Sequence, residues 1–286
     1  MLSALWEYQF LQNAFVAGIL ASIVCGMIGV IIVEKKLVMM SGGIAHTAYG
    51  GVGLGYLLGF EPIIGAFVFS VCAALGIGYI NNKGGTSSDV IIGLFWSMGM
   101  ALGILFIALM PGYPPDLSSY LFGNILSVTR GDLYLMIALT LIVVFVVVVF
   151  FNHWKTYLFD EEFAAILGIK TKLFEYVLLI LVAMTVVVLI RVVGIILVIA
   201  LLTAPAASAG LLSLNFRNRM IYAIIIGIIF CLTGMWISYE MNIASGAAIV
   251  ILSVSFYFCL YLGRQVKVNI QKRSWKRQSL KNEEIK

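Results

Sequence analysis

His46 is the residue of this chain best suited to bind a metal ion inside an apolar segment, since the other histidine, His153, lies among polar residues. Neutral imidazole is a ligand for zinc and iron, and an ionisable side chain at membrane depth usually serves a function. A structural zinc site needs about four ligands, which one histidine among scattered cysteines does not provide. We therefore expect His46 to contact an ion transiently. The alternative is that His46 has no contact with an ion and only forms a hydrogen bond to a neighbouring helix.

If an ion passes His46 on its way through the protein, polar side chains near the ends of other apolar segments could also contact or attract it. Glu240 and Asn242 follow one apolar run, and Glu61 and Asp116 lie in turns between runs. Carboxylates at a pore mouth attract cations through their electrostatic field. Asp116 or Glu61 could therefore supply negative charge at the outer mouth of a metal path, although no spacing here defines a ligand set.

The polar segment 152–172 contains residues suited to docking a partner. Asp160, Glu161 and Glu162 would begin a short helix, because acidic residues are favoured at helix N-termini. Ala165 lies within this helix, and Gly168 is a typical helix stop. Its apolar side chains are Phe163, Ile166 and Leu167. Such a helix fits a hydrophobic groove of another protein, although it could equally lie on its own helix bundle.

Small residues recur every four positions in the apolar segment that holds His46. The stripe comprises Gly43, Thr47, Gly51, Gly55 and Gly59. Small residues at this spacing allow another helix to approach backbone to backbone. Gly42, His46 and Gly50 form the neighbouring stripe, so we expect His46 to face a crowded helix interface or a narrow cavity.

The elements that position these residues must be membrane helices. Hydrophobic residues make up 62% of the chain and charged residues 11%, against about 25% charged in soluble domains. A transmembrane helix needs about 20 mainly apolar residues. Suitable runs lie at 11–33, 37–60, 62–80, 90–110, 133–151, 173–190, 192–213, 219–239 and 243–262. This pattern predicts an all-α, polytopic bundle of eight or nine spans, because the two runs around Arg191 could form one broken unit.

The distribution of Lys and Arg predicts the orientation of the spans. With nine spans and an outer N-terminus, only Arg130 and Arg191 of the 18 basic residues lie outside. Basic residues accumulate on the cytoplasmic side of membranes. We therefore expect a transmembrane domain over 1–263, with segment 152–172 on its cytoplasmic side. A basic cytoplasmic tail would follow over 264–286, and nothing in the sequence indicates a nucleic-acid partner.

Four segments together resemble the metal-ion permease family of ATP-binding-cassette (ABC) importers. They are SGGIAH at 41–46, SYLFGNIL at 119–126, FDEEFAAILGIK at 159–170 and VGIILVIALLTAPA at 193–206. The resemblance implies a homodimeric permease in a prokaryotic plasma membrane, fed by an extracytoplasmic metal-binding protein and driven by a separate cytoplasmic ATPase. It implies no catalytic activity and no resident cofactor in the permease itself. Zinc is the first expected cargo, with manganese or iron next.

The same resemblance assigns roles to particular residues. It implies that His46 contacts the metal and that the segment around Asp160, Glu161, Glu162, Ala165 and Gly168 couples the permease to the ATPase. The family commonly has Asp four residues before this histidine and again in the last outer turn. This chain has Gly42 and Asn242 at those positions, so a carboxylate on the His46 face is missing. Glu240, two residues before Asn242, could substitute, so the resemblance implies a metal path of His46, Glu240 and Asn242.

Three other classes of protein are alternatives. The chain contains no G-x-x-x-x-G-K-[ST] motif, so its energy comes from another chain or from an ion gradient, as in a secondary transporter. An ABC permease for metal chelates, such as siderophores or cobalamin, is a closer competitor. An intramembrane enzyme would need a constellation such as H-E-x-x-H, which the two histidines do not form.

Overall fold

The computed structural model describes residues 8–83, 88–112, 123, 125–241 and 243–284, with the side chains of Leu126 and of 273–284 left undescribed. These residues form α-helices and one 3-10 turn, with no strand among them. The elements are α2 (Gln9–Glu34), α3 (Val38–Leu58), α4 (Pro62–Lys83), α5 (Ser88–Ala108), η1 (Ile125–Ser127), α7 (Arg130–Val149), α8 (Phe151–Phe159), α9 (Glu161–Ile166), α10 (Thr171–Leu212), α11 (Phe216–Met241) and α12 (Ser245–Glu284). The predicted all-α class is thus confirmed.

Seven of the described helices are long and apolar enough to cross a membrane, fewer than the expected eight or nine spans. Two elements account for the difference. α3 is 21 residues long, but its glycines, Ser41 and His46 lower its hydropathy. α10 counts once although it covers two of the predicted apolar runs.

α10 reverses direction near its middle. A straight helix of 42 residues would be about 63 Å long, twice the roughly 30 Å of the hydrocarbon core. Gly194 interrupts it with a left-handed φ of 79° and a ψ of 162°, values that favour glycine. Arg191, just before this break, pairs with Asp132 at the start of α7. The middle of α10 therefore lies beside the N-terminus of α7.

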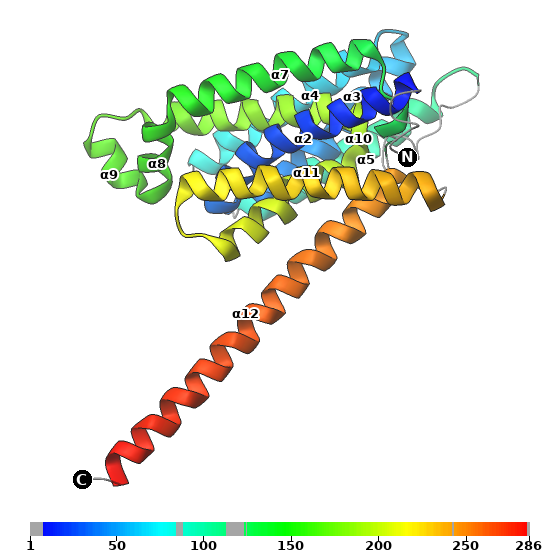
Figure 1. Cartoon of the computed structure of the whole chain (residues 1–286). Helices are drawn as coiled ribbons and strands as arrows, with labels where there is room; N and C mark the ends of the chain where they lie inside the picture. The colour runs from blue at the N-terminus through cyan, green and yellow to red at the C-terminus, as the bar shows by residue number, and fades with distance from the viewer. Residues whose placement is uncertain (1–7, 84–87, 113–122, 124, 242, 285–286) are drawn as a thin grey trace.

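Both ends of α10 lie at the opposite end of the bundle. Near its start, Glu175 accepts a hydrogen bond from Asn82 at the end of α4, at 2.9 Å. Just after its end, Arg219 pairs with Glu34 at the end of α2. α10 is thus a helical hairpin that turns at Gly194. We call the end of the bundle that holds α8 and α9 the α9 end, and the opposite end the Arg191 end (Figure 1).

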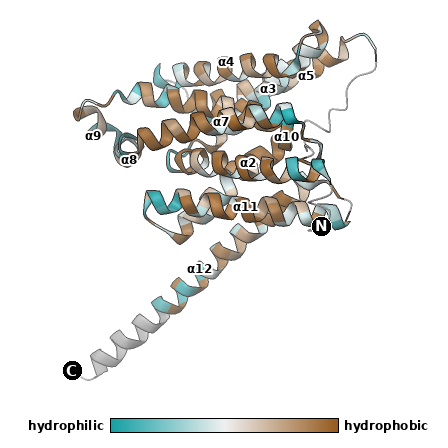
Figure 2. Ribbon diagram, turned by 45° about the horizontal axis from the view of Figure 1, so that its top comes forward, coloured by the Kyte–Doolittle hydropathy of each residue, from teal (hydrophilic) through white to brown (hydrophobic). Residues whose placement is uncertain are grey.

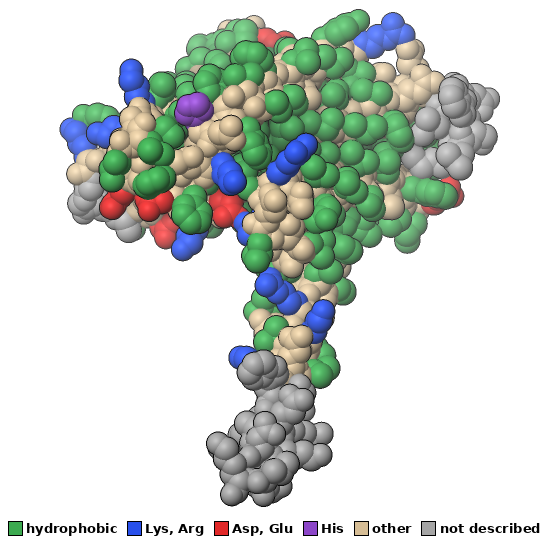
Figure 3. Space-filling model, turned by 60° about the vertical axis from the view of Figure 1, so that its left-hand side comes forward, with side chains coloured by type: hydrophobic (Ala, Val, Ile, Leu, Met, Phe, Trp, Pro, Cys, Tyr) green, Lys and Arg blue, Asp and Glu red, His purple; other side chains and the backbone are tan. Residues whose placement is uncertain are grey.

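α2 and α10 form the centre of the bundle. Their most apolar windows are 67% and 78% buried, against 28% in α5 and 33% in α7. The outer helices therefore present apolar faces outward, as membrane helices do towards lipid. Figures 2 and 3 show hydrophobic residues along the flanks and polar or charged residues at the helix ends.

α12 leaves the bundle and projects away from it (Figure 1). The basic tail predicted over 264–286 begins within this helix, which continues without interruption through Gly263 to Glu284. Its basic segment is therefore an extension of the last apolar helix.

Candidate transport path and docking helix

The glycines of α3 bring its backbone against two neighbouring helices. A Cβ atom added to Gly51 would overlap the backbone of Gly65 in α4. One added to Gly53 would lie 2.6 Å from the carbonyl oxygen of Gly103 in α5. Real Cβ atoms do not approach backbone atoms so closely, so only glycine permits this packing. α3 is consequently held between α4 and α5 with almost no side-chain layer.

Three of the four glycines predicted to pack do face a neighbour. Gly43 faces Ile92 of α5, Gly51 faces Gly65, and Gly55 faces Pro62. Gly59 was wrongly included, because no atom lies within 4 Å of the position of its Cβ. Gly59 instead ends α3 with a φ of 74°, the left-handed conformation typical of a helix C-terminus.

His46 faces α5 and is half-buried. Its ring stacks on Trp96, with centroids 3.9 Å apart and planes inclined by 12°. Its Nδ1 atom lies 3.4 Å from Sδ of Met100. The imidazole therefore shares its environment with a thioether, which is a soft ligand, while Gly42 on the same helix face contributes no side chain.

The other predicted path residues are not brought beside His46. Glu240 is exposed in the last turn of α11, a helix that packs on α2, α10 and α12, whereas α3 packs on α4, α5 and α10. Asn242 and Asp116 lie outside the described residues. Within the described part of the chain, no three His, Cys, Asp or Glu side chains converge as a metal site. The two neighbours that contact the His46 ring among the described residues, Trp96 and Met100, are neutral.

The predicted docking helix is α9, and its two ends are well defined. Asp160 is its N-cap, because its side chain accepts a hydrogen bond from the backbone N–H of Phe163 at 3.0 Å. At the other end, Gly168 has a φ of 80°. The N–H groups of Gly168 and Ile169 donate to the carbonyls of Ala165 and Ala164, both at 3.0 Å. This pattern is a Schellman motif, which requires a residue that tolerates the left-handed conformation.

α9 turns one small residue inward and its apolar side chains outward. Ala164 is fully buried, whereas Ile166 is 81% exposed and the preceding Phe159 is 90% exposed. Glu162 and Ala165 are also exposed. Exposed apolar side chains around a short helix are typical of a surface that another protein covers.

Glu161 differs from the other acidic residues because it fixes α9 to the bundle. Its carboxylate lies 2.8 Å from Nζ of Lys35, which follows α2. The same ammonium lies 3.5 Å from the ring centroid of Tyr157 in α8, a cation–π contact. Burial, followed by the nearby Glu161 and Glu175 carboxylates, raises the pKa of the Tyr157 hydroxyl, so it stays neutral. Glu161 therefore has a partner within its own chain.

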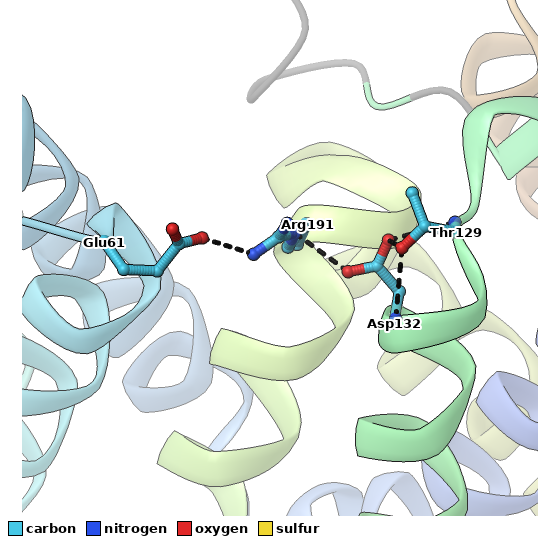
Figure 4. Close-up of polar contacts among 4 residues, drawn as sticks. All are labelled: Glu61, Thr129, Asp132 and Arg191. Carbon is cyan, nitrogen blue, oxygen red and sulfur yellow. Dashed lines mark hydrogen bonds and ion pairs between the residues drawn. The ribbon is translucent and has the colours of Figure 1, made fainter.

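Three charged residues meet at the Arg191 end (Figure 4). Arg191 Nη1 lies 2.7 Å from Glu61, and its Nε lies 2.8 Å from Asp132. The other oxygen of Asp132 accepts bonds from the Thr129 N–H and hydroxyl, at 3.0 and 2.6 Å. Thr129 and Asp132 form a capping box, a motif readable in the sequence, but nothing in the sequence pairs them with Arg191.

The match to known proteins covers most of the chain. A model of the ABC 3 transport family matches residues 7–263. The chain belongs to this family. It is a multi-pass membrane permease of an ABC importer, as the resemblance implied, and ATP hydrolysis is the task of a separate subunit.

Individual relatives agree with this assignment. The uncharacterised membrane protein slr2045 of Synechocystis is 42% identical, over 88% of this chain and 89% of that protein. The manganese transport system membrane protein MntC of Listeria monocytogenes is 35% identical, over 91% and 93%. The structure of PsaBC from Streptococcus pneumoniae in complex with Fab superposes with a TM-score of 0.82 at 32% identity, over 91% of this chain and 94% of that one. These likenesses confirm the polytopic bundle and the metal-ion permease family.

Proposed function

We propose that this ABC 3 family chain carries manganese into the cytoplasm as the membrane subunit of an ATP-driven importer. The observation that supports manganese is the 35% identity, over nearly the whole chain, to a permease named for manganese transport. The family resemblance alone favours zinc, with manganese or iron next. We place manganese first, because permeases named for manganese transport or import recur among the relatives.

The path of the ion is proposed to pass His46 at the contact between α3 and α5. Support comes from the position of its Nδ1 atom beside Met100 and from the glycine packing that places α3 inside the bundle. Because carboxylates suit manganese better than thioethers do, these two side chains do not by themselves select manganese. Weak, transient contact suits a conduit, which must also release the ion. Selection would then belong to the extracytoplasmic binding protein that delivers it.

The docking site of the ATPase is proposed to be α9, with the α9 end in the cytoplasm. The exposed Phe163, Ile166 and Leu167 would enter a groove of the ATPase, while Glu161 and Lys35 keep α9 fixed to the bundle. Movement of the ATPase would therefore reach α2 and α3 through that ion pair. A second permease copy would complete the importer, and the chain itself would hold no catalytic site or resident cofactor.

Metal accumulation tests this function directly. Cells lacking their own manganese importer would express the chain with its ATPase and binding protein, and uptake of radioactive manganese and zinc would be measured in competition. We expect manganese uptake that an excess of magnesium does not abolish. Zinc uptake unaffected by manganese would contradict the proposed cargo, and uptake that continues without the ATPase would favour a secondary transporter.

A further inference from the structure

The Arg191 side chain connects two helices that do not pack on each other extensively. Glu61 lies in the turn between α3 and α4, and Asp132 lies in the first turn of α7. α4 packs on α3, α5 and α10, while α7 packs on α2, α8 and α10. Arg191 stands between them on α10, three residues before the Gly194 turn, and binds both carboxylates. Figure 4 shows the guanidinium bridging the two acidic side chains.

The two arms of this bridge differ in strength. The Asp132 side chain is only 9% exposed, and its second oxygen is held by Thr129. The Glu61 side chain is 55% exposed and lies in a turn. Exposed ion pairs are weak because water competes for both charges. The Asp132 arm is therefore fixed, and the Glu61 arm is the one that separates first.

Glu61 and Arg191 both line a partly open cavity of about 280 Å³. Its lining comes from α3, α4 and α10, and includes Val52, Ile63, Ala66, Val187, Ile190 and Arg191. Glu61 and Pro62 also belong to its lining, so release of Glu61 from Arg191 would free the α3–α4 turn to move away from α10. The cavity would then widen at the Arg191 end and expose its buried lining.

We infer that Arg191 is a latch that closes the outer end of the permease by holding Glu61, while Asp132 keeps the guanidinium in place. Together the three groups carry one net negative charge, so a divalent cation is attracted to the latch and competes with Arg191 for Glu61. Arrival of the cation would thus favour the open state. The inference rests on the proposed transport function for its purpose, but the structure of the latch is independent of the cargo.

Accessibility of the cavity tests the latch. Ile190→Cys would be introduced into a full-length chain whose four native cysteines are replaced by serine or alanine, co-expressed with the ATPase. Its reaction with a membrane-impermeant maleimide would be followed from the outer side. Ile190 lines the cavity and is 3% exposed, so its labelling reports opening. Glu61→Gln should raise the labelling rate about three- to fivefold, as expected for loss of one exposed ion pair.

Arg130→Gln is the matched control, because this arginine lies at the same end, at the start of α7, and contacts Gln9 among the described residues. It should leave the labelling rate unchanged, and Arg191→Lys should give an intermediate rate. An unchanged rate in Glu61→Gln would overturn the latch, as would an equal increase in Arg130→Gln. Since labelling needs no metal uptake, failure of the latch and failure of the manganese assignment give different results.

Discussion

At the residue scale, His46 lies between the indole of Trp96 and the sulfur of Met100. Removal of the imidazole should sharply reduce metal uptake, because neither Trp96 nor Met100 offers a nitrogen or oxygen ligand in its place. We therefore expect His46→Ala to reach the membrane in normal amounts but to accumulate little manganese. His153→Ala is the control, since this histidine lies in α8 outside the apolar spans and should retain uptake. Uptake that survives in His46→Ala would show that His46 only packs against α5.

Met100 provides a second test at the same place. Leucine has a similar volume, so Met100→Leu removes the thioether with little change in packing. Thioethers favour softer ions than manganese. The variant should therefore transport manganese normally while zinc competes with it less effectively, measured as the zinc concentration that halves manganese uptake. Unchanged competition would exclude Met100 from contact with the ion.

Gly51 makes the closest backbone contact of α3, and its substitution should destabilise the protein. A methyl group in Gly51→Ala would meet the backbone of Gly65, and overpacking costs about 1–3 kcal/mol. The melting temperature of the purified permease should fall. Gly93→Ala in α5 is the control, because no atom lies within 4 Å of its Cβ position. An equal fall in both variants would mean that close packing of α3 is not the cause.

At the element scale, α9 depends on a glycine that stops it at the right point. Gly168→Ala would place a Cβ in the left-handed conformation, which costs about 1–2 kcal/mol. We expect normal membrane insertion but weaker co-purification of the ATPase, because the exposed apolar side chains of α9 would shift. Gly210→Ala, in the last turns of α10 with open space around it, should retain the ATPase. Normal ATPase recovery in Gly168→Ala would count against docking on α9.

The sequence predicted the helices well because their signals are local. Apolar runs, the glycine stripe of α3 and the stop at Gly168 each depend on neighbours a few residues apart. The reversal within α10 was harder to predict, since a single glycine in an apolar run can pack, kink or turn. Only its φ of 79° and the contacts of Arg191 distinguish these outcomes. Gly59 was misassigned for the same reason, because the four-residue spacing continues past the point where α3 ends.

The contacts between distant segments could not be predicted from the sequence. Lys35 and Glu161 are 126 residues apart, and Arg191 and Glu61 are 130 apart. In the sequence, Lys35 and Arg191 are interpreted only as signals of membrane orientation, because Lys and Arg near the ends of spans indicate the cytoplasmic side. The partners Trp96 and Met100 of His46 belong to a different helix, so spacing along α3 could not indicate them.

At the scale of the whole molecule, the arrangement of the helices predicts where the chain termini lie. When α10 is counted as two membrane crossings and α3, α2, α4, α5, α7, α11 and α12 as one each, nine crossings separate the N-terminus from the basic end of α12. An epitope tag after Lys286 should therefore resist external protease in intact cells, whereas a tag before residue 8 should be cleaved. Cleavage of the C-terminal tag with protection of the N-terminal tag would mean that the orientation is inverted and α9 lies outside. Cleavage of both tags would require an even number of crossings.

The glycine contacts of α3 also restrict how the permease can move. Helices separated by side chains can slide past each other through small changes of rotamer, which is the basis of shear motions. At Gly51 and Gly53, α3 meets the backbones of α4 and α5 directly, so no rotamer change at these two contacts can absorb such sliding. α3, α4 and α5 should consequently rotate as one rigid body. The hinge between this body and the rest of the molecule must then lie where α3 and α4 meet α10.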